Sequence, residues 1–264
     1  MHKKIIMIVG HGSRKKESNA AFESFVQKFR ERMPEQNIRI AYVELAEPAL
    51  KLALEKVAYE TEEITVLPLF LLTAGHIKHD IVGAIEQLKK DFPRVKFILA
   101  SALGLHKNMI ELTFKRLTES AQNLSAAPLK TSILMIGRGS SDTGANSDFC
   151  KLVRMIEEQM PYDRIAYCFM AIVRPKVEEA LERLIAENPQ AILIQPYLIF
   201  DGVLYQRLQD MVEKYTVLHP EIFFRLSSVL GEDALIFDTL EKRLLDAQSG
   251  KELELCVSCG GVIV

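Results

Sequence analysis

The chain has 264 residues, of which 48% are hydrophobic and 26% are charged. This composition fits a folded globular protein and excludes an intrinsically disordered one. Lys and Arg number 33 and Asp and Glu 35, so there is no basic surplus to bind a nucleic acid. No apolar run reaches the roughly 18 residues that a membrane helix needs, and the run after Lys4 is too short for a signal peptide. We therefore expect a cytoplasmic protein that acts without nucleic acid or membrane.

The predicted elements of the first part of the chain alternate between strands and helices. Strands are expected where Ile, Val and Leu form short runs, and helices where apolar residues recur about every 3.6 positions. In chain order the predicted strands are Lys4–Val9, Ile38–Glu44, Ile64–Leu71 and Val95–Ala100. Ser18 or Asn19 is expected to cap the first helix, which ends near Met33. The other predicted helices cover Pro48–Tyr59, Ile77–Asp91 and Lys107–Gln122.

The second part of the chain repeats this pattern. The motif Gly10–Ser13 returns as Gly137–Ser140, 127 residues later, and eight of the ten prolines pair at a spacing of 127 or 128 residues. This register indicates a duplicated half, with a first domain at 1–124 and a second at 130–264. The alternation predicts an α/β fold with two similar doubly wound parallel sheets that face one another across a cleft. The predicted strands of the second half are Thr131–Ile136, Arg164–Phe169, Ala191–Gln195 and Ile222–Leu226.

Three polar residues stand at predicted strand ends in the first half. His11 follows the first strand, Glu44 ends the second, and His76 follows the third. If the strand order is 2-1-3-4, these ends are neighbours in a sheet whose strands lie about 4.8 Å apart. Two imidazoles and one carboxylate can bind a divalent metal ion and leave coordination positions open. The sequence therefore predicts a single metal site in the first domain.

The second half differs at all three of these positions together. Arg138 stands in the place of His11, Ala171 in that of Glu44, and Val203 or Leu204 in that of His76. Packing alone gives little reason for this set to change while the scaffold is kept. The comparison indicates that the three residues are functional, and that the second half forms the facing wall of the cleft with a degenerate site.

Simpler interpretations exist for single residues. A lone loop histidine is often solvated, and a carboxylate at a strand end can be a surface charge. His79 is either a further partner of the metal site or a solvated helix residue, and Asp80 suits the start of a helix. The loop Gly10–Arg14 lacks the lysine and the spacing of a phosphate-binding loop. We expect no organic cofactor.

Taken together, these motifs resemble the class II tetrapyrrole chelatases that act on sirohydrochlorin, in their long, two-half form. The resemblance covers nearly the whole chain, and its combined motifs are far more specific than any one of them. Four segments carry the resemblance. Two are the loop Gly10–Arg14 after the first strand and Glu44, which precedes Glu47-Pro48. The others are the run Pro68–His76, which is followed by Lys78–Ile81, and the loop Arg138–Ser141 of the second half.

The resemblance implies a lyase that inserts a divalent metal ion into sirohydrochlorin, the metal being a substrate. The metal is Fe²⁺ in siroheme biosynthesis or Co²⁺ in anaerobic cobalamin biosynthesis. Family histidines at the positions of His11 and His76 bind the metal and take up the pyrrole protons, and the position of Glu44 assists. We favour Fe²⁺, because the tail of this chain lacks the histidine-rich stretch of some cobalt-type members.

Sirohydrochlorin is rich in carboxylates, so cations and helix N-termini should bind it. The candidates near strand ends are Arg14, Lys78, Arg138 and Arg174. Arg138 is the strongest of them, because it occupies the place of His11 in the other half. The alternative for each is a solvated surface cation, above all for Arg14 and Lys78.

The four cysteines fall into two kinds. Cys150 and Cys168 stand singly and are expected to be buried apolar residues. Cys256 and Cys259 form a Cys-x-x-Cys near the C-terminus, which in some long family members accompanies an iron–sulfur cluster. One pair cannot complete a four-thiolate cluster without a second subunit, so we favour plain tail cysteines. We expect a monomer or a weak homodimer.

Two other classes of protein compete with the chelatase hypothesis. A non-catalytic metal or tetrapyrrole carrier would use the same cleft and would have no turnover to lose. A two-domain sugar or amino-acid binding protein would retain metal equally well after Glu44→Ala. Within the chelatases, a cobaltochelatase is the alternative to a ferrochelatase, since affinity order alone does not select the metal.

Overall fold

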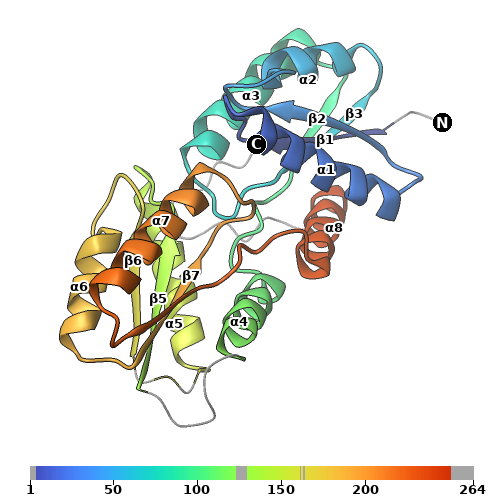
Figure 1. Cartoon of the computed structure of the whole chain (residues 1–264). Coiled ribbons are helices and arrows are strands. Elements are labelled where there is room, and N and C mark those ends of the chain that lie inside the picture. The colour runs from blue at the N-terminus through green and yellow to red at the C-terminus, as the bar shows by residue number, and fades with distance from the viewer. Residues whose placement is uncertain (1–3, 123–129, 161, 163, 251–264) are drawn as a thin grey trace. The chain divides into compact units, whose positions relative to one another are not determined.

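The computed structural model describes residues 4–122, 130–160, 162 and 164–250. Strands alternate with helices along these ranges (Figure 1). The strands are β1 (Lys4–Gly10), β2 (Asn37–Tyr42), β3 (Glu63–Pro68), β4 (Lys96–Leu99), β5 (Thr131–Gly137), β6 (Arg164–Phe169), β7 (Ala191–Pro196) and β8 (Phe223–Leu226). The helices are α1 (Lys16–Arg32), α2 (Leu50–Ala58), η1 (His76–Ile81), α3 (Val82–Asp91), α4 (Lys107–Ala121), α5 (Thr143–Glu157), α6 (Val177–Ala186), α7 (Val203–Leu218) and α8 (Ala234–Gln248).

The strands form two four-stranded sheets, with the orders β2-β1-β3-β4 and β6-β5-β7-β8. Every pairing in both sheets is parallel. In each sheet the chain pairs its first two strands and then crosses to the other side of the first one. The predicted α/β fold with two doubly wound parallel sheets is confirmed, and so is the strand order from which the metal site was predicted.

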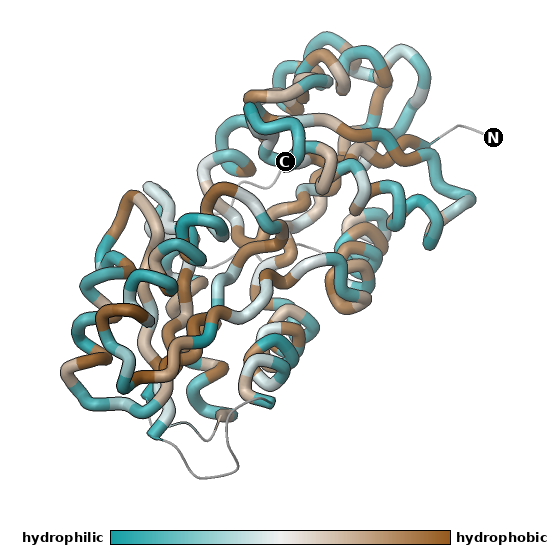
Figure 2. Tube along the Cα trace, in the orientation of Figure 1, coloured by the Kyte–Doolittle hydropathy of each residue, from teal (hydrophilic) through white to brown (hydrophobic). Residues whose placement is uncertain are grey.

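Hydrophobic side chains alternate along β1 between two buried faces. Ile5, Met7 and Val9 belong to a core cluster with residues of α2 and α3. Ile6 and Ile8 point to the opposite face and are at most 1% exposed. A strand buried on both faces reads as an unbroken apolar run, whereas the covering helices alternate between hydrophobic and hydrophilic positions (Figure 2). The two helix layers thus hold β1 rigidly beneath the loop that carries His11.

The loops after β1 and β5 share a backbone feature that requires glycine. Gly12 has φ +89° and Gly139 has φ +85°. A Cβ on Gly12 would stand 1.8 Å from the carbonyl oxygen of Glu44, and one on Gly139 would stand 2.2 Å from that of Ala171. The duplication therefore extends to a close approach between the loop after the central strand and the loop after the edge strand.

The last helix of each repeat packs against the other repeat. Among the described residues, one compact unit comprises residues 4–106 together with residues 236–250, and the other lies within residues 107–235. Phe237 of α8 stacks on Phe25 of α1 with ring centroids 4.5 Å apart. The compact units thus differ from the predicted domains 1–124 and 130–264, because α4 and α8 exchange places.

Two helix starts differ from the prediction. The first helix begins at Lys16 with Lys15 at the cap position, so Ser18 and Asn19 lie inside the helix and do not cap it. The Asn19 side chain instead donates a hydrogen bond to the Ser13 carbonyl oxygen at 2.8 Å. The helix expected from Ile77 begins one residue earlier, at His76, with the π-helical turn η1. Both differences lie in loops next to the predicted metal site.

The cysteine predictions have mixed outcomes. Cys168 is buried, as expected, whereas Cys150 is only partly buried. Cys256 and Cys259 lie outside the described residues. Within the described parts of the chain, none of the helices combines the length and the apolar character needed to cross a bilayer.

Candidate metal site

Three loops bring the metal-site candidates to one edge of the first sheet. Val9 of β1 lies opposite Ala41 of β2 and Pro68 of β3, so these three strands end at nearly the same level. His11 follows the end of β1, Glu44 lies two residues beyond β2, and His76 is the first residue of η1 after β3. Glu44 is thus in the loop and not on the strand as predicted.

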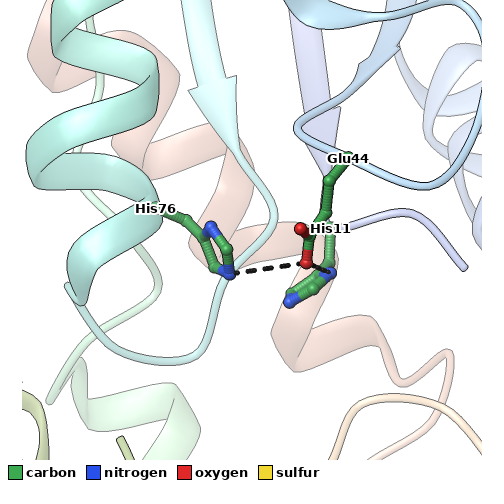
Figure 3. Close-up of side chains that lie close together, drawn as sticks. All are labelled: His11, Glu44 and His76. Carbon is green, nitrogen blue, oxygen red and sulfur yellow. Dashed lines mark ion pairs between the residues drawn. The ribbon is translucent and has the colours of Figure 1, made fainter. Parts of the chain in front are cut away.

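The three side chains point toward one another (Figure 3). Oε1 of Glu44 lies 3.5 Å from Nδ1 of His11 and 4.0 Å from Nε2 of His76. The imidazole centroids are 4.4 Å apart and their planes meet at 76°. One candidate ligand atom from each residue lies within 4.8 Å of the other two. This is the one such group of His, Cys, Asp and Glu found among the described residues.

Asp80 fixes the orientation of His76. Asp80 lies four residues after His76 in η1, and its Oδ2 lies 2.8 Å from Nδ1 of His76. A carboxylate at this nitrogen holds the proton on Nδ1 and leaves the lone pair on Nε2, which is the atom that faces Glu44. This is the arrangement by which a carboxylate commonly orients a metal-binding histidine.

His11 is oriented by its own loop. Its Nδ1 lies 3.2 Å from the carbonyl oxygen of Gly12 and 3.5 Å from Oε1 of Glu44. Both oxygens are acceptors, so the neutral imidazole carries its proton on Nδ1 and presents the lone pair of Nε2. The same close approach that demands glycine at position 12 thus places His11 beside Glu44.

Phe70 lies beside both imidazoles. Its ring centroid is 6.5 Å from that of His11 and 6.4 Å from that of His76. Its side chain also packs against the core cluster beneath the sheet edge. Phe70 therefore provides an apolar support that limits how far either histidine can tilt.

The site is open on one side. The side chains of His11, His76 and Glu44 are 31%, 26% and 45% exposed. Two nitrogen donors and one carboxylate suit a first-row divalent metal, and three protein ligands leave at least one position for another molecule. A closed structural zinc site would instead have four protein ligands.

The second sheet keeps the scaffold but not these side chains. Arg138 follows β5, Ala171 follows β6, and Val203 begins α7 directly after Gly202, as His76 begins η1 directly after Gly75. The structure thereby selects Val203 over Leu204 as the counterpart of His76.

The four predicted substrate cations occupy different surroundings. Arg14 is exposed in the loop before α1, and Lys78 is half-buried within η1, so both belong to the unit with the metal site. Arg138 and Arg174 are exposed and belong to the other unit, where Arg174 forms an ion pair with Glu179. Their contact with a substrate remains a prediction.

Sequence reasoning missed two residues of the site. Asp80 was assigned only to a helix start, although its spacing of four residues from His76 is a signal for a side-chain contact. Phe70 lies within the run Pro68–His76, and the sequence indicates no role for it at the site. An aromatic residue beside a metal site has no distinguishing sequence signal, because core strand ends commonly carry one.

Duplicated parallel sheets, with His11, Glu44 and His76 converging at the strand ends of the first one, are what the resemblance to the tetrapyrrole chelatases implies. Comparison with known proteins agrees, since the model of the CbiX family matches residues 5–120 and again 132–247. The chain belongs to the CbiX family.

Three relatives show how far the likeness extends. A sirohydrochlorin cobaltochelatase of Priestia megaterium is 32% identical over 258 residues, which cover 97% of this chain and 83% of the relative. A sirohydrochlorin ferrochelatase of Bacillus subtilis (strain 168) is 26% identical over 251 residues, covering 95% of this chain and 94% of the relative. The solved structure of SirB from Bacillus subtilis with Fe³⁺ has a TM-score of 0.79 and 25% identity, and covers 94% of this chain and 98% of its own.

Proposed function

We propose that this protein is a sirohydrochlorin chelatase, which inserts a divalent metal ion into the macrocycle of sirohydrochlorin. The observation that carries the proposal is the convergence of His11, Glu44 and His76, with ligand atoms within 4.8 Å of one another. The relatives named for this reaction include both ferrochelatases and cobaltochelatases, and they span nearly the whole chain.

The metal ion is held as a substrate by Nε2 of the two histidines and by the carboxylate of Glu44. Nitrogen and oxygen donors of this kind bind first-row divalent ions without enclosing them. The exposed side of the site admits the pyrrole nitrogens, so protein ligands can be exchanged for ring nitrogens one after another. Glu44, the most exposed of the three at 45%, is the ligand best placed to detach first.

Metal insertion must also dispose of two protons. The ring loses two N–H protons as the divalent ion enters, so the charge of the macrocycle does not change. Each imidazole that releases the metal regains a lone pair and can accept one of these protons near neutral pH. Asp80 stabilises the imidazolium that forms at His76, because its carboxylate contacts the opposite nitrogen at 2.8 Å.

Cations position the carboxylates of sirohydrochlorin. We assign this role to Arg14 and Lys78 of the unit with the metal site, and to Arg138 of the second half. The fourth predicted cation, Arg174, pairs with Glu179 and lines a separate cavity of the second half. Arginine suits carboxylates because its fork of donors can bind both oxygens at once.

The donor set accepts both Fe²⁺ and Co²⁺. Affinity at an open site of two imidazoles and one carboxylate rises along the first-row series and does not separate these two neighbouring ions strongly. We keep Fe²⁺ as the expected physiological metal, with Co²⁺ as the alternative.

An anaerobic absorbance assay with sirohydrochlorin tests the function. Wild-type protein is mixed separately with Fe²⁺, Co²⁺ and Ni²⁺, and insertion is followed by the change in the macrocycle spectrum. We expect rates well above the spontaneous one with Fe²⁺ and Co²⁺. A carrier would bind sirohydrochlorin without accelerating insertion, and no acceleration with any metal would refute the proposal.

A further inference from the structure

A cavity of about 590 Å³ that is widely open to solvent lies in the second unit, between α5 and β6, which is an edge strand of its sheet. Its volume falls in the range of pockets that hold small molecules. The lining that matters here comes from one face of α5, from alternate residues of β6 and from the loop that follows: Cys150, Lys151, Arg154, Tyr167, Phe169 and Arg174.

The floor of the cavity is aromatic. Phe169 is 3% exposed and Tyr167 is 39% exposed, and their rings meet edge to face with centroids 6.0 Å apart. Cys150 shares a hydrogen bond with the Tyr167 hydroxyl, which raises the pKa of Tyr167 and keeps the hydroxyl neutral. Such a floor favours a flat apolar body.

The rim of the cavity is cationic. The side chains of Lys151, Arg154 and Arg174 are 55%, 66% and 77% exposed. Each already contacts carboxylates of the protein: Asp148, Glu157 with Glu158, and Glu179. Exposed ion pairs contribute little to stability, so the carboxylates of a ligand can replace these partners at small cost.

The first half provides an internal reference for this cavity. Gly10 lies opposite Tyr42 and Gly137 lies opposite Phe169, which fixes the correspondence between the halves. Tyr42 donates a hydrogen bond to Glu23 at 2.9 Å, at the place where the second half has Phe169 and Cys150. The three cations of the rim also have counterparts 127 residues earlier in the chain. Lys151, Arg154 and Arg174 correspond to Ser24, Gln27 and Glu47 of the first half.

The halves therefore differ in charge at this place. At the compared positions, two carboxylates and no cation in the first half correspond to three cations and no carboxylate in the second, where the cations pair with carboxylates outside the lining. These rim positions are at the surface, where packing does not decide the residue type. A shared change of sign around an aromatic floor points to an anionic ligand in the second half.

We propose that this cavity binds an aromatic polycarboxylate, with its flat body against Tyr167, which packs on the buried Phe169, and its carboxylates on Lys151, Arg154 and Arg174. The ligand class rests on the cavity alone. The identity of the natural occupant rests on the proposed function, because sirohydrochlorin and its metallated product are aromatic polycarboxylates. In that case the second half holds a further macrocycle, apart from the one at the metal site.

Protection of Cys150 from alkylation tests the proposal on the full-length, metal-free protein. The alkylation rate is read from the Cys150 peptide by mass spectrometry, with Cys168, which is 0% exposed, as an unreactive internal control. The ligands are sirohydrochlorin, uroporphyrin as an aromatic polycarboxylate, and citrate as an aliphatic one. We expect both macrocycles to slow alkylation of Cys150 about tenfold at saturation and citrate to leave it unchanged.

The second part of the experiment uses variants in which residues of the cavity are replaced by their counterparts from the first half. In Lys151→Ser/Arg154→Gln, the concentration of uroporphyrin that gives half protection should rise about tenfold, since two charge-assisted contacts are lost. The matched control is Arg164→Gln, which removes an exposed cation from the opposite face of β6 and should change nothing.

Three results would overturn the proposal: no protection by either macrocycle, equal protection by citrate, or full protection in the double variant. Chelatase turnover is measured on the same preparations. If the proposed function fails, protection of Cys150 by uroporphyrin persists. If the cavity proposal fails, turnover persists without protection of Cys150.

Discussion

At the scale of single residues, the 2.8 Å contact between His76 and Asp80 decides which nitrogen of His76 faces Glu44. Asp80→Ala should weaken metal binding about 10- to 100-fold, because His76 loses the partner that fixes its tautomer and its orientation. Asp80→Asn should lie between this variant and the wild type. Titration with Co²⁺ in the absence of macrocycle measures the effect.

The matched control for Asp80 is His79→Ala, since His79 is exposed on the same short helix. It should bind Co²⁺ like the wild type. Unchanged affinity in Asp80→Ala would show that Asp80 does not orient the ligand.

Gly12 tests the loop that carries His11. Gly12→Ala places a Cβ 1.8 Å from the carbonyl oxygen of Glu44 at φ +89°, so the two loops must separate. We expect a loss of at least about 2 kcal/mol in the free energy of unfolding, together with weaker metal binding. Urea denaturation measures the first effect.

Gly83→Ala is the control for Gly12→Ala. Gly83 lies within α3, and among the described residues no atom outside its own helix turn stands within 4 Å of the added Cβ. This variant should raise the free energy of unfolding by about 0.5–1 kcal/mol, because alanine is the better helix former. A similar loss in both variants would argue against the loop clash.

The sequence was sufficient to select the three residues that the structure brings together, because the duplicated half serves as a built-in control in which His11, Glu44 and His76 are all replaced. It was not sufficient for Phe70 and Asp80. Their roles depend on the tilt of a ring and on a π-helical turn, which neither periodicity nor spacing specifies.

At the scale of elements, α4 is anchored in the second unit by Asp233. This side chain is 7% exposed and contacts Lys115 at 2.6 Å and Arg116 at 3.3 Å. Burial raises the pKa of Asp233, but hydrogen bonds from Lys115 and from the Leu235 backbone, with the two nearby positive charges, outweigh it and lower the pKa overall. The ionised carboxylate thus stabilises the attachment of α4.

Asp233→Asn should lower the free energy of unfolding by about 2–4 kcal/mol, because a buried charge loses its partner. The contribution has a defined pH dependence. The folded pKa is below the unfolded value of about 3.9, so the stabilisation is present above that value and is lost as the pH falls through the folded pKa. Urea titrations of wild type and variant between neutral pH and pH about 3 should therefore converge at the acidic end.

The control for Asp233 is Glu119→Gln. Glu119 is 42% exposed and also pairs with Arg116, so its loss should change the free energy of unfolding by less than about 0.5 kcal/mol. If Asp233→Asn is equally mild, the contact does not anchor α4.

The strands and their order could be predicted, since runs of Ile, Val and Leu that end at the same repeat positions define a doubly wound sheet. The exchange of α4 and α8 could not. Both helices have an apolar face of the same period, so each would fit either half. Long-range contacts decide with which half each helix packs. Arg243 of α8 donates to the Leu103 carbonyl oxygen, and Arg116 of α4 donates to the Leu230 carbonyl oxygen.

At the scale of the whole molecule, one half of a duplicated scaffold carries the candidate metal site, and the other has Arg138, Ala171 and Val203 at the matching positions. This division predicts separable effects on the reaction. Arg138→Ala should raise the sirohydrochlorin concentration needed for half-maximal rate about tenfold, because a charge-assisted contact to a carboxylate is lost, while Co²⁺ affinity stays unchanged. A steady-state assay with a parallel Co²⁺ titration checks both values, and a change in Co²⁺ affinity alone would contradict the assignment.

The central claim is that His11, Glu44 and His76 jointly hold the metal ion in an open site. X-ray absorption spectroscopy of the Co²⁺-loaded protein, without macrocycle, tests it most directly. We predict two imidazole ligands and oxygen ligands in the wild type, and one imidazole in both His11→Ala and His76→Ala. A spectrum without imidazole ligands, or with an unchanged imidazole count in either variant, would contradict the account.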